Sequence, residues 1–141
     1  MKRYLLDINV LLALSWPSHV HHNQTAHWFS RILGFSTCPF TESGFVRLSS
    51  NSSYTPNPVA PLEALALLRQ ITSLPGHQFW PASLPLSEAI RPDCPVVGHR
   101  QITDAYLIAL AAEHGGILAT LDRGAAALAS DPSLVELVQG E

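Results

Sequence analysis

The sequence predicts an α/β fold with a short, mainly parallel central sheet flanked by helices. Short apolar runs alternate with longer segments whose apolar residues recur at helical spacing, which is the pattern of βαβ units. The apolar runs do not alternate with polar residues, as expected of strands that are buried on both faces. A chain of 141 residues, 47% of them hydrophobic, is long enough for one domain with its own core and too short for two. We therefore expect a single domain over residues 1–141.

The first half of the chain is expected to contain two strands and three helices. The apolar run at 4–7 is too short for a helix and fits a buried strand. Pro17 and Gly34 are stop signals for helices, and Thr41 is a suitable helix cap. The predicted elements are a strand at 4–7, a helix at 9–14, a helix at 22–33, a strand at 35–39 and a helix at 42–49, followed by a loop to residue 61.

The second half continues the alternation. Pro61 suits the first position of a helix, and the glycines at 115 and 116 suit a helix end. Residues 81–98 are rich in proline and are expected to be irregular, with one helical turn at 86–90. The predicted elements are a helix at 61–73, a strand at 77–80, a helix at 101–114, a strand at 117–121, a helix at 123–129 and a last strand at 134–138.

Four acidic residues lie within or against the most apolar segments, where a carboxylate needs a partner. Asp7 and Asp122 each follow a predicted strand, and Glu42 and Asp104 each lie in the first turn of a predicted helix. In an open parallel sheet, the carboxyl ends of the strands share an edge with the helices that follow them, and the binding crevice lies there. We therefore expect the four acids to meet at that edge.

A meeting of four carboxylates calls for positive charge. Two carboxylates about 4 Å apart repel by roughly 4 kcal/mol at an effective dielectric of about 20, and the chain has only eight Lys and Arg residues. An all-oxygen site suits Mg²⁺ or Mn²⁺, with Asn9 and Thr120 as supporting oxygen groups, and such a site suits phosphodiester hydrolysis. Taken singly, each acid could be an ordinary turn or helix-start residue. Taken together, the four acids favour a metal site.

Composition excludes some classes of protein. The net charge of −3 provides no basic field for nucleic acid. The two cysteines, Cys38 and Cys94, form no disulfide framework or metal-ligand spacing; with no signal peptide in view, they favour a reducing cytoplasm. No apolar run approaches the roughly 18 residues of a membrane span, so no membrane association is expected.

Four segments together resemble the four acidic motifs of PIN-domain ribonucleases, and most closely those of VapC-type toxins from bacterial toxin–antitoxin pairs. In order, these segments are LLDINVL (5–11), TESGFVR (41–47), TDAYLIALA (103–111) and LATLDR (118–123). The resemblance covers essentially the whole chain. It implies a PIN-like three-layer fold and a Mg²⁺- or Mn²⁺-dependent endoribonuclease. It also implies a homodimer that a cognate antitoxin holds inactive.

The resemblance also assigns roles to residues. Asp7, Glu42, Asp104 and Asp122 occupy the catalytic acid positions, and Asp7 and Asp104 are the expected direct metal ligands. No acidic position of the pattern is missing.

Basic residues near these motifs are candidates for contacts with RNA. Arg47, Arg100 and Arg123 lie close in sequence to three of the acids, and guanidinium groups suit phosphate oxygens. They could equally form ion pairs that hold the acids, and the sequence does not decide between these roles. His19 is a further candidate for a contact with RNA, or is solvated.

Two other functions compete with the nuclease. A phosphoaspartyl enzyme would also use Asp7 at a strand end, but it needs a lysine at a late strand end, and Lys2 is the only lysine of the chain. A non-catalytic binding or regulatory subunit is the stronger alternative, because an acidic pocket can receive an arginine-bearing partner peptide.

Overall fold

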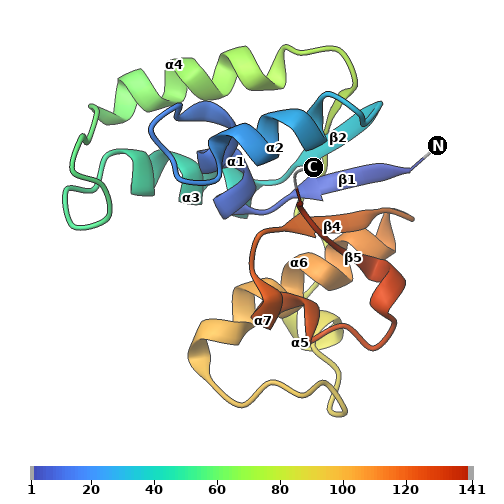
Figure 1. Cartoon of the computed structure of the whole chain (residues 1–141). Helices are drawn as coiled ribbons and strands as arrows, with labels where there is room; N and C mark the ends of the chain where they lie inside the picture. Colours follow the sequence, from blue (N-terminus) through green and yellow to red (C-terminus); the bar gives the residue numbers. More distant parts are fainter. Residues whose placement is uncertain (1, 140–141) are drawn as a thin grey trace.

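A five-stranded sheet in which all neighbours are parallel forms the centre of the molecule (Figure 1). The computed structural model describes residues 2–139 of the chain. The strands lie in the order β3-β2-β1-β4-β5. Their bounds are β1 Arg3–Leu6, β2 Gly34–Thr37, β3 His77–Phe79, β4 Ile117–Thr120 and β5 Val135–Leu137. The prediction of an α/β fold with a short parallel sheet is thus confirmed.

Helices cover both faces of this sheet and make the three layers that were predicted. In Figure 1, α1 to α4 lie in the upper half of the molecule and α5 to α7 in the lower half, and the two groups pack against different cores. Within residues 2–139, no helix is long and apolar enough to cross a membrane. The helices are α1 Ile8–Ser15, α2 His22–Phe29, α3 Pro39–Ser49, α4 Pro61–Thr72, α5 Leu86–Ala89, α6 Ile102–Glu113 and α7 Arg123–Ala126, with 3₁₀ turns η1 His99–Gln101 and η2 Pro132–Leu134.

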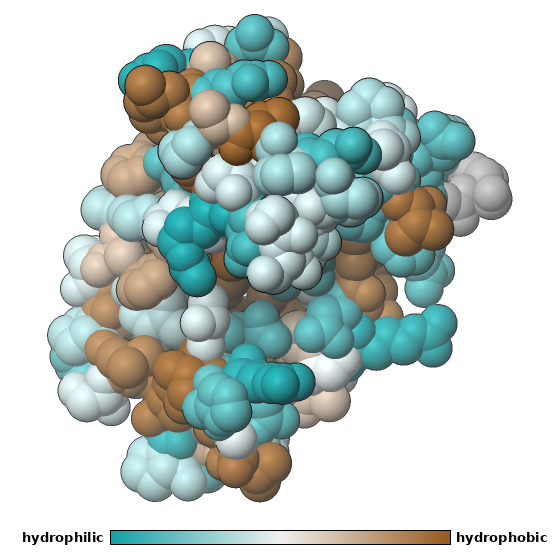
Figure 2. All heavy atoms as spheres, turned by 90° about the vertical axis from the view of Figure 1, so that its left-hand side faces the viewer, coloured by the Kyte–Doolittle hydropathy of each residue, from teal (hydrophilic) through white to brown (hydrophobic). Residues whose placement is uncertain are grey.

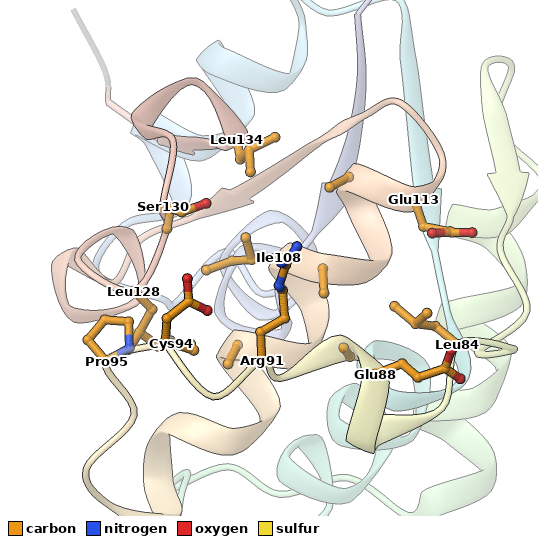
Figure 3. A pocket seen from close by; sticks show the side chains of 16 residues that line it. Leu84, Glu88, Arg91, Cys94, Pro95, Ile108, Glu113, Leu128, Ser130 and Leu134 are labelled. Atoms are coloured by element: carbon orange, nitrogen blue, oxygen red, sulfur yellow. The ribbon is translucent and has the colours of Figure 1, made fainter.

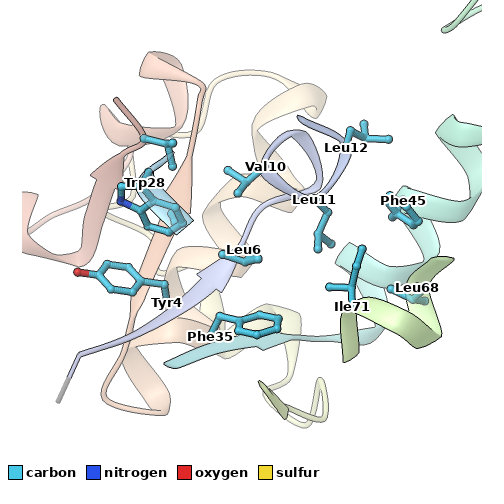
Figure 4. Close-up of a cluster of buried hydrophobic side chains, with 12 residues drawn as sticks. Tyr4, Leu6, Val10, Leu11, Leu12, Trp28, Phe35, Phe45, Leu68 and Ile71 are labelled. Atoms are coloured by element: carbon cyan, nitrogen blue, oxygen red, sulfur yellow. The ribbon is translucent and has the colours of Figure 1, made fainter. Parts of the chain in front are cut away.

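The apolar run of β1 serves two cores because successive side chains of a strand point to opposite faces. Tyr4 and Leu6 belong to the core under α1 to α4, whose members Figure 4 shows converging on the strand. Leu5 belongs to the second core, which it shares with Leu107 and Leu110 of α6. This two-sided burial is why the strand has no polar alternation.

Three predicted helix boundaries are wrong by about one turn. The helix expected at 123–129 ends at Ala126, and the chain turns at Ala127 and Leu128. The helix expected at 22–33 ends at Phe29, because Gly34 already pairs with Arg3 in the sheet and the chain needs the residues between to turn. The helix expected from residue 42 begins at Pro39, with Cys38 rather than Thr41 at the cap position. A proline at the first helical position has no backbone N–H, so the helix start has one fewer donor to satisfy.

The strand order determines where a site can form. From β1 the chain adds β2 and β3 on one side, and later adds β4 and β5 on the other. The point at which the order reverses lies between β1 and β4, and ligands of open parallel sheets bind beyond the carboxyl ends of the strands at such a point. Asp7 directly follows β1, and Asp122 follows β4 after one intervening residue.

Candidate functional site

Asp7 is a fixed and buried carboxylate at the end of β1. It caps α1, because its Oδ1 accepts a hydrogen bond from the backbone N of Ile8 at 2.8 Å. Its Oδ2 accepts a hydrogen bond from Thr120 Oγ1 at 2.6 Å. The residue is only 5% exposed. Both oxygens therefore have partners that fix their direction at the edge of the sheet.

Thr120, the last residue of β4, connects the predicted site residues across the point where the strand order reverses. Besides donating to Asp7, its Oγ1 accepts a hydrogen bond from Asn9 Nδ2 at 3.3 Å and one from the backbone N of Asp122 at 3.1 Å. Asn9 Oδ1 in turn accepts from the backbone N of Leu121 at 3.1 Å. Asn9 and Thr120 thus hold the ends of β1 and β4 together beside Asp7. Their role as supporting oxygen groups of a metal site stays a prediction.

Three of the four predicted acids interact electrostatically, and we refer to Asp7, Asp104 and Asp122 as the acidic cluster. Burial raises the pKa of Asp104 to about 6, with further contributions from the charges of Asp7 and Asp122. Burial also raises the pKa of Asp7, and the charge of Asp122 adds to this effect, while hydrogen bonds from Thr120 and Ile8 oppose it. Their surroundings therefore disfavour the ionised form of both Asp7 and Asp104.

Glu42 has its hydrogen-bond partner outside this cluster. It is in the first turn of α3, and its Oε2 accepts a hydrogen bond from Thr37 Oγ1, at the end of β2, at 2.7 Å. Its charge acts on the pKa of His77 and of Cys38, and it is not among the causes that raise the pKa of the clustered aspartates. Electrostatic contributions thus link three of the four predicted acids, and the hydrogen bond from Thr37 directs one oxygen of Glu42 toward the end of β2.

The close approach of α1 and α3 depends on a glycine. A Cβ at Gly44 would collide with the side chain of Ile8, the residue that follows Asp7. Gly44 is in α3 two residues after Glu42 and is buried. The absence of a side chain there is what allows the helix that carries Glu42 to pack against the helix that Asp7 caps.

The face that carries these strand ends has a mixed surface. Figure 2 looks onto the left-hand side of Figure 1, toward which β1 and β4 run, and hydrophilic atoms there separate several hydrophobic patches. Arg47, Arg100 and Arg123 are exposed. His19 is partly buried and lines a cavity of about 510 Å³, which none of the four acids lines. Contacts of these four residues with RNA remain predictions.

A larger cavity, of about 610 Å³, lies on the outer side of α6. The loop that follows α5 and residues 128–134 form its other walls. Arg91 projects among the lining residues, which include Ile108 and Leu134 (Figure 3). None of the four acids lines this cavity either, so it is separate from the acidic cluster.

The donor set of the acidic cluster suits a hard divalent cation. Carboxylate oxygens are the ligands that Mg²⁺ and Mn²⁺ prefer. Burial, followed by the charges of Asp7 and Asp122, raises the pKa of Asp104, and a bound cation would stabilise its ionised form. Among residues 2–139, no group of three or more His, Cys, Asp or Glu side chains is gathered closely enough to form a complete metal site. The carboxylates interact through space rather than in direct contact.

Comparison with known proteins identifies the family. The PIN domain model matches residues 4–130. The chain is 48% identical to Ribonuclease VapC39 of Mycobacterium tuberculosis over 139 residues, which cover 95% of this chain and 98% of that protein. The chain belongs to the PIN domain family. Within that family it is also 41% identical to Ribonuclease VapC38 of the same species over 128 residues, which cover 89% of each protein.

A solved structure of a PIN-domain protein confirms the fold. The crystal structure of VapC20 of Mycobacterium tuberculosis, a toxin that cleaves the sarcin–ricin loop, matches with a TM-score of 0.63. The match covers 92% of this chain and 97% of that one, at 14% sequence identity. At that identity the likeness concerns the fold alone. The resemblance to PIN-domain ribonucleases of the VapC type, which was inferred from four short motifs, is confirmed by the close relatives.

The sequence analysis missed two residues that contact the candidate site. Thr37 and His77 form one hydrogen-bonded group with Glu42, but neither is acidic and they are 40 positions apart in the chain. The sequence held only a weak indication that these two residues meet. Alternate positions of a strand share a face, so Thr37 shares one with Phe35, which pairs with His77 in the sheet.

Proposed function

We propose that this chain is a divalent-metal-dependent endoribonuclease and the toxin of a VapBC-type (type II) toxin–antitoxin system. The observation that carries this proposal is the acidic cluster at the point where the strand order reverses. Burial and the neighbouring carboxylates raise the pKa of Asp7 and of Asp104 there. The names of relatives that are 41–48% identical over nearly the whole chain support the same activity.

Asp7 and Asp104 are the residues that would hold Mg²⁺ or Mn²⁺. When bound, such an ion lowers the pKa of a water molecule and neutralises charge on the leaving oxygen of a phosphodiester. Asp122 adds to the negative potential of the cluster, and Thr120 keeps Asp7 in place. The protein thereby supplies a rigid, negatively charged edge that attracts the cation.

The other candidate residues would act on the RNA. Glu42 uses one carboxylate oxygen for Thr37, which leaves the other free to accept a hydrogen bond from an attacking water. Arg47, Arg100 and Arg123 are exposed and suit contacts with phosphate oxygens. Neutralisation of phosphates by these groups would offset the repulsion between RNA and a chain of net charge −3. His19 is proposed as a more distant contact.

We further propose a cognate antitoxin, a homodimer and a cytoplasmic location. The names of the relatives support the first of these. Exposed hydrophobic side chains, among them Leu62 at 78% and Val97 at 92%, support association with another chain. Two cysteines outside any disulfide support a reducing compartment. We propose residues 1–141 as one PIN domain.

Metal-dependent cleavage of RNA tests the proposed function. The purified chain, free of antitoxin, is incubated with total bacterial RNA in EDTA, Mg²⁺ or Mn²⁺, and the fragment ends are sequenced. We expect discrete fragments with Mg²⁺ or Mn²⁺ only. Asp7→Asn should abolish them, whereas the matched control Asp131→Asn, at an exposed acid outside the cluster, should cleave like the wild type.

Intact RNA in every sample of folded protein would contradict the nuclease. It would favour the alternative function, a non-catalytic subunit whose acidic pocket receives an arginine-bearing peptide. Cleavage by Asp7→Asn at the wild-type rate would contradict the assignment of the site.

A further inference from the structure

Glu42 is held by a short chain of hydrogen bonds that reaches the edge strand of the sheet. Thr37 Oγ1, at the end of β2, donates to Glu42 Oε2 at 2.7 Å. The same Oγ1 lies 2.8 Å from Nε2 of His77, the first residue of β3. Thr37 is completely buried and the other two residues are partly buried. The three side chains therefore form a compact, sheltered group.

The chemistry of the hydroxyl gives this chain a direction. A threonine hydroxyl has one proton to donate and two lone pairs that accept. An ionised carboxylate only accepts, so the proton of Thr37 must point to Glu42. The contact with His77 can then be a hydrogen bond only if Nε2 of the imidazole carries a proton and donates it.

His77 is itself held in place on two sides. Its ring packs against the ring of Phe35, with centroids 5.2 Å apart. Burial lowers its pKa and the charge of Arg3 adds to this effect, whereas the charge of Glu42 and a hydrogen bond to the backbone of Thr72 oppose it. A backbone carbonyl only accepts, so the bond to Thr72 uses a proton on the other ring nitrogen and competes with a proton on Nε2. A neutral imidazole has one N–H, which either ring nitrogen can carry. A proton on Nε2 supports the orientation of Glu42, whereas a proton on Nδ1 would turn Thr37 toward the ring and leave Glu42 without its donor.

We propose that His77 is a positioning residue that orients Glu42 through the hydroxyl of Thr37. His77 does not contact the acidic cluster; it fixes the proton of Thr37, which fixes one carboxylate oxygen of Glu42 and leaves the other directed for use. This inference rests on the proposed nuclease function. It adds Thr37 and His77, both uncharged when they orient Glu42, to the residues of the proposed site.

Kinetics of four variants test the chain. Thr37→Val keeps the shape and removes the hydroxyl, and His77→Phe keeps the ring on Phe35 and removes the donor. Each should lower kcat for RNA cleavage by about 10- to 100-fold, as is usual for partners that orient a site residue, with KM nearly unchanged. Thr37→Ser and His77→Gln retain a hydroxyl and an N–H donor, and should recover most of the rate.

A double mutant separates positioning from general damage to the fold. If His77 acts only through Thr37, the variant that carries both Thr37→Val and His77→Phe should be no slower than Thr37→Val alone. The matched control is His114→Phe, since His114 also stacks on an aromatic ring, that of Trp80 at 4.4 Å, but lies outside this group. It should keep the wild-type rate. The proposal would be overturned if the fold-losses in kcat of the two single variants multiplied in the double mutant. Full activity of His77→Phe would overturn it as well.

Tautomer measurement by NMR provides a readout that needs neither RNA nor metal. In protein with ¹⁵N-labelled histidine, we expect His77 to carry its proton on Nε2, and to move it to Nδ1 in Thr37→Val. A proton on Nδ1 in the wild type would overturn the proposal. If the wild type folds but cleaves no RNA, the nuclease function fails, while the tautomer still decides whether this chain of hydrogen bonds exists.

Discussion

At the scale of single residues, Asp104 illustrates how placement governs the behaviour of an acid. It lies in the first turn of α6, where a helix start favours a carboxylate. Burial and the charges of Asp7 and Asp122 nevertheless raise its pKa to about 6. The unfavourable surroundings outweigh the helix start, which is worth about 0.3–1 kcal/mol, so the ionised Asp104 does not stabilise the metal-free fold.

This pKa predicts how stability depends on pH. A carboxyl whose pKa is raised by folding binds its proton more tightly in the folded state, so its contribution to stability is complete below the unfolded pKa of 3.8 and is lost as the pH rises toward about 6. Asp104→Asn removes this loss. In metal-free buffer at pH 7 it should raise the free energy of unfolding by about 1 kcal/mol, after allowance for solvent screening. Urea unfolding at pH 7 and pH 4 measures the effect.

Asp131 provides the control of opposite sign. Hydrogen bonds from the backbone and side chain of Ser133 lower its pKa, so Asp131→Asn should destabilise the protein slightly at pH 7 and lose that effect at low pH. Equal gains from both substitutions would contradict the assignment of repulsion to the acidic cluster.

At the scale of helices and strands, the contact between α1 and α3 links stability to the site. Gly44→Ala would place a methyl group against Ile8. Overpacking costs about 1–3 kcal/mol, which exceeds the roughly 1 kcal/mol that alanine gains over glycine inside a helix. We expect the free energy of unfolding to fall by about 1 kcal/mol and RNA cleavage to fall with it, because Glu42 moves relative to Asp7. Thermal unfolding and cleavage rates check both effects.

Gly98 is the matched control for this substitution. A Cβ there meets nothing within 4 Å and its φ is not positive. Gly98→Ala should leave stability and cleavage unchanged. If Gly44→Ala proves equally neutral, Ile8 has room to move and the glycine is not what determines the approach of the two helices.

At the scale of the whole molecule, the acidic cluster joins strands from both halves of the chain. A cation bound by Asp7 and Asp104 would therefore stabilise the folded state as a unit, by about 2.7 kcal/mol at 100 times its Kd. We expect Mg²⁺ to raise Tm at pH 7, and to raise it less at pH 5 because protons then compete for Asp104. Calorimetry with and without EDTA measures this rise.

The same titration with Asp104→Asn tests whether the cluster is the binding site. The variant should have a higher Tm than the wild type in EDTA and should gain little from Mg²⁺. A rise in Tm as large as that of the wild type would place the cation elsewhere on the molecule.

By itself the sequence determined the α/β class, the order of strands and helices and the positions of Asp7 and Asp122 after strands, because these features depend on local periodicity and on neighbours in the chain. Helix ends were less well predicted: α3 begins at Pro39 and α2 ends at Phe29. Caps and turns at these helix ends depend on the position of the neighbouring strand in the sheet.

Only the tertiary structure decided which acids interact and what holds them. Thr37 and His77 are 40 positions apart and meet through the register of β2 and β3. Thr120 reaches Asp7 across 113 positions because β4 pairs with β1. Register and strand order result from the packing of both faces of the sheet rather than from any local pattern, so the hydrogen bonds that hold Glu42 and Asp7 could not be read from the chain.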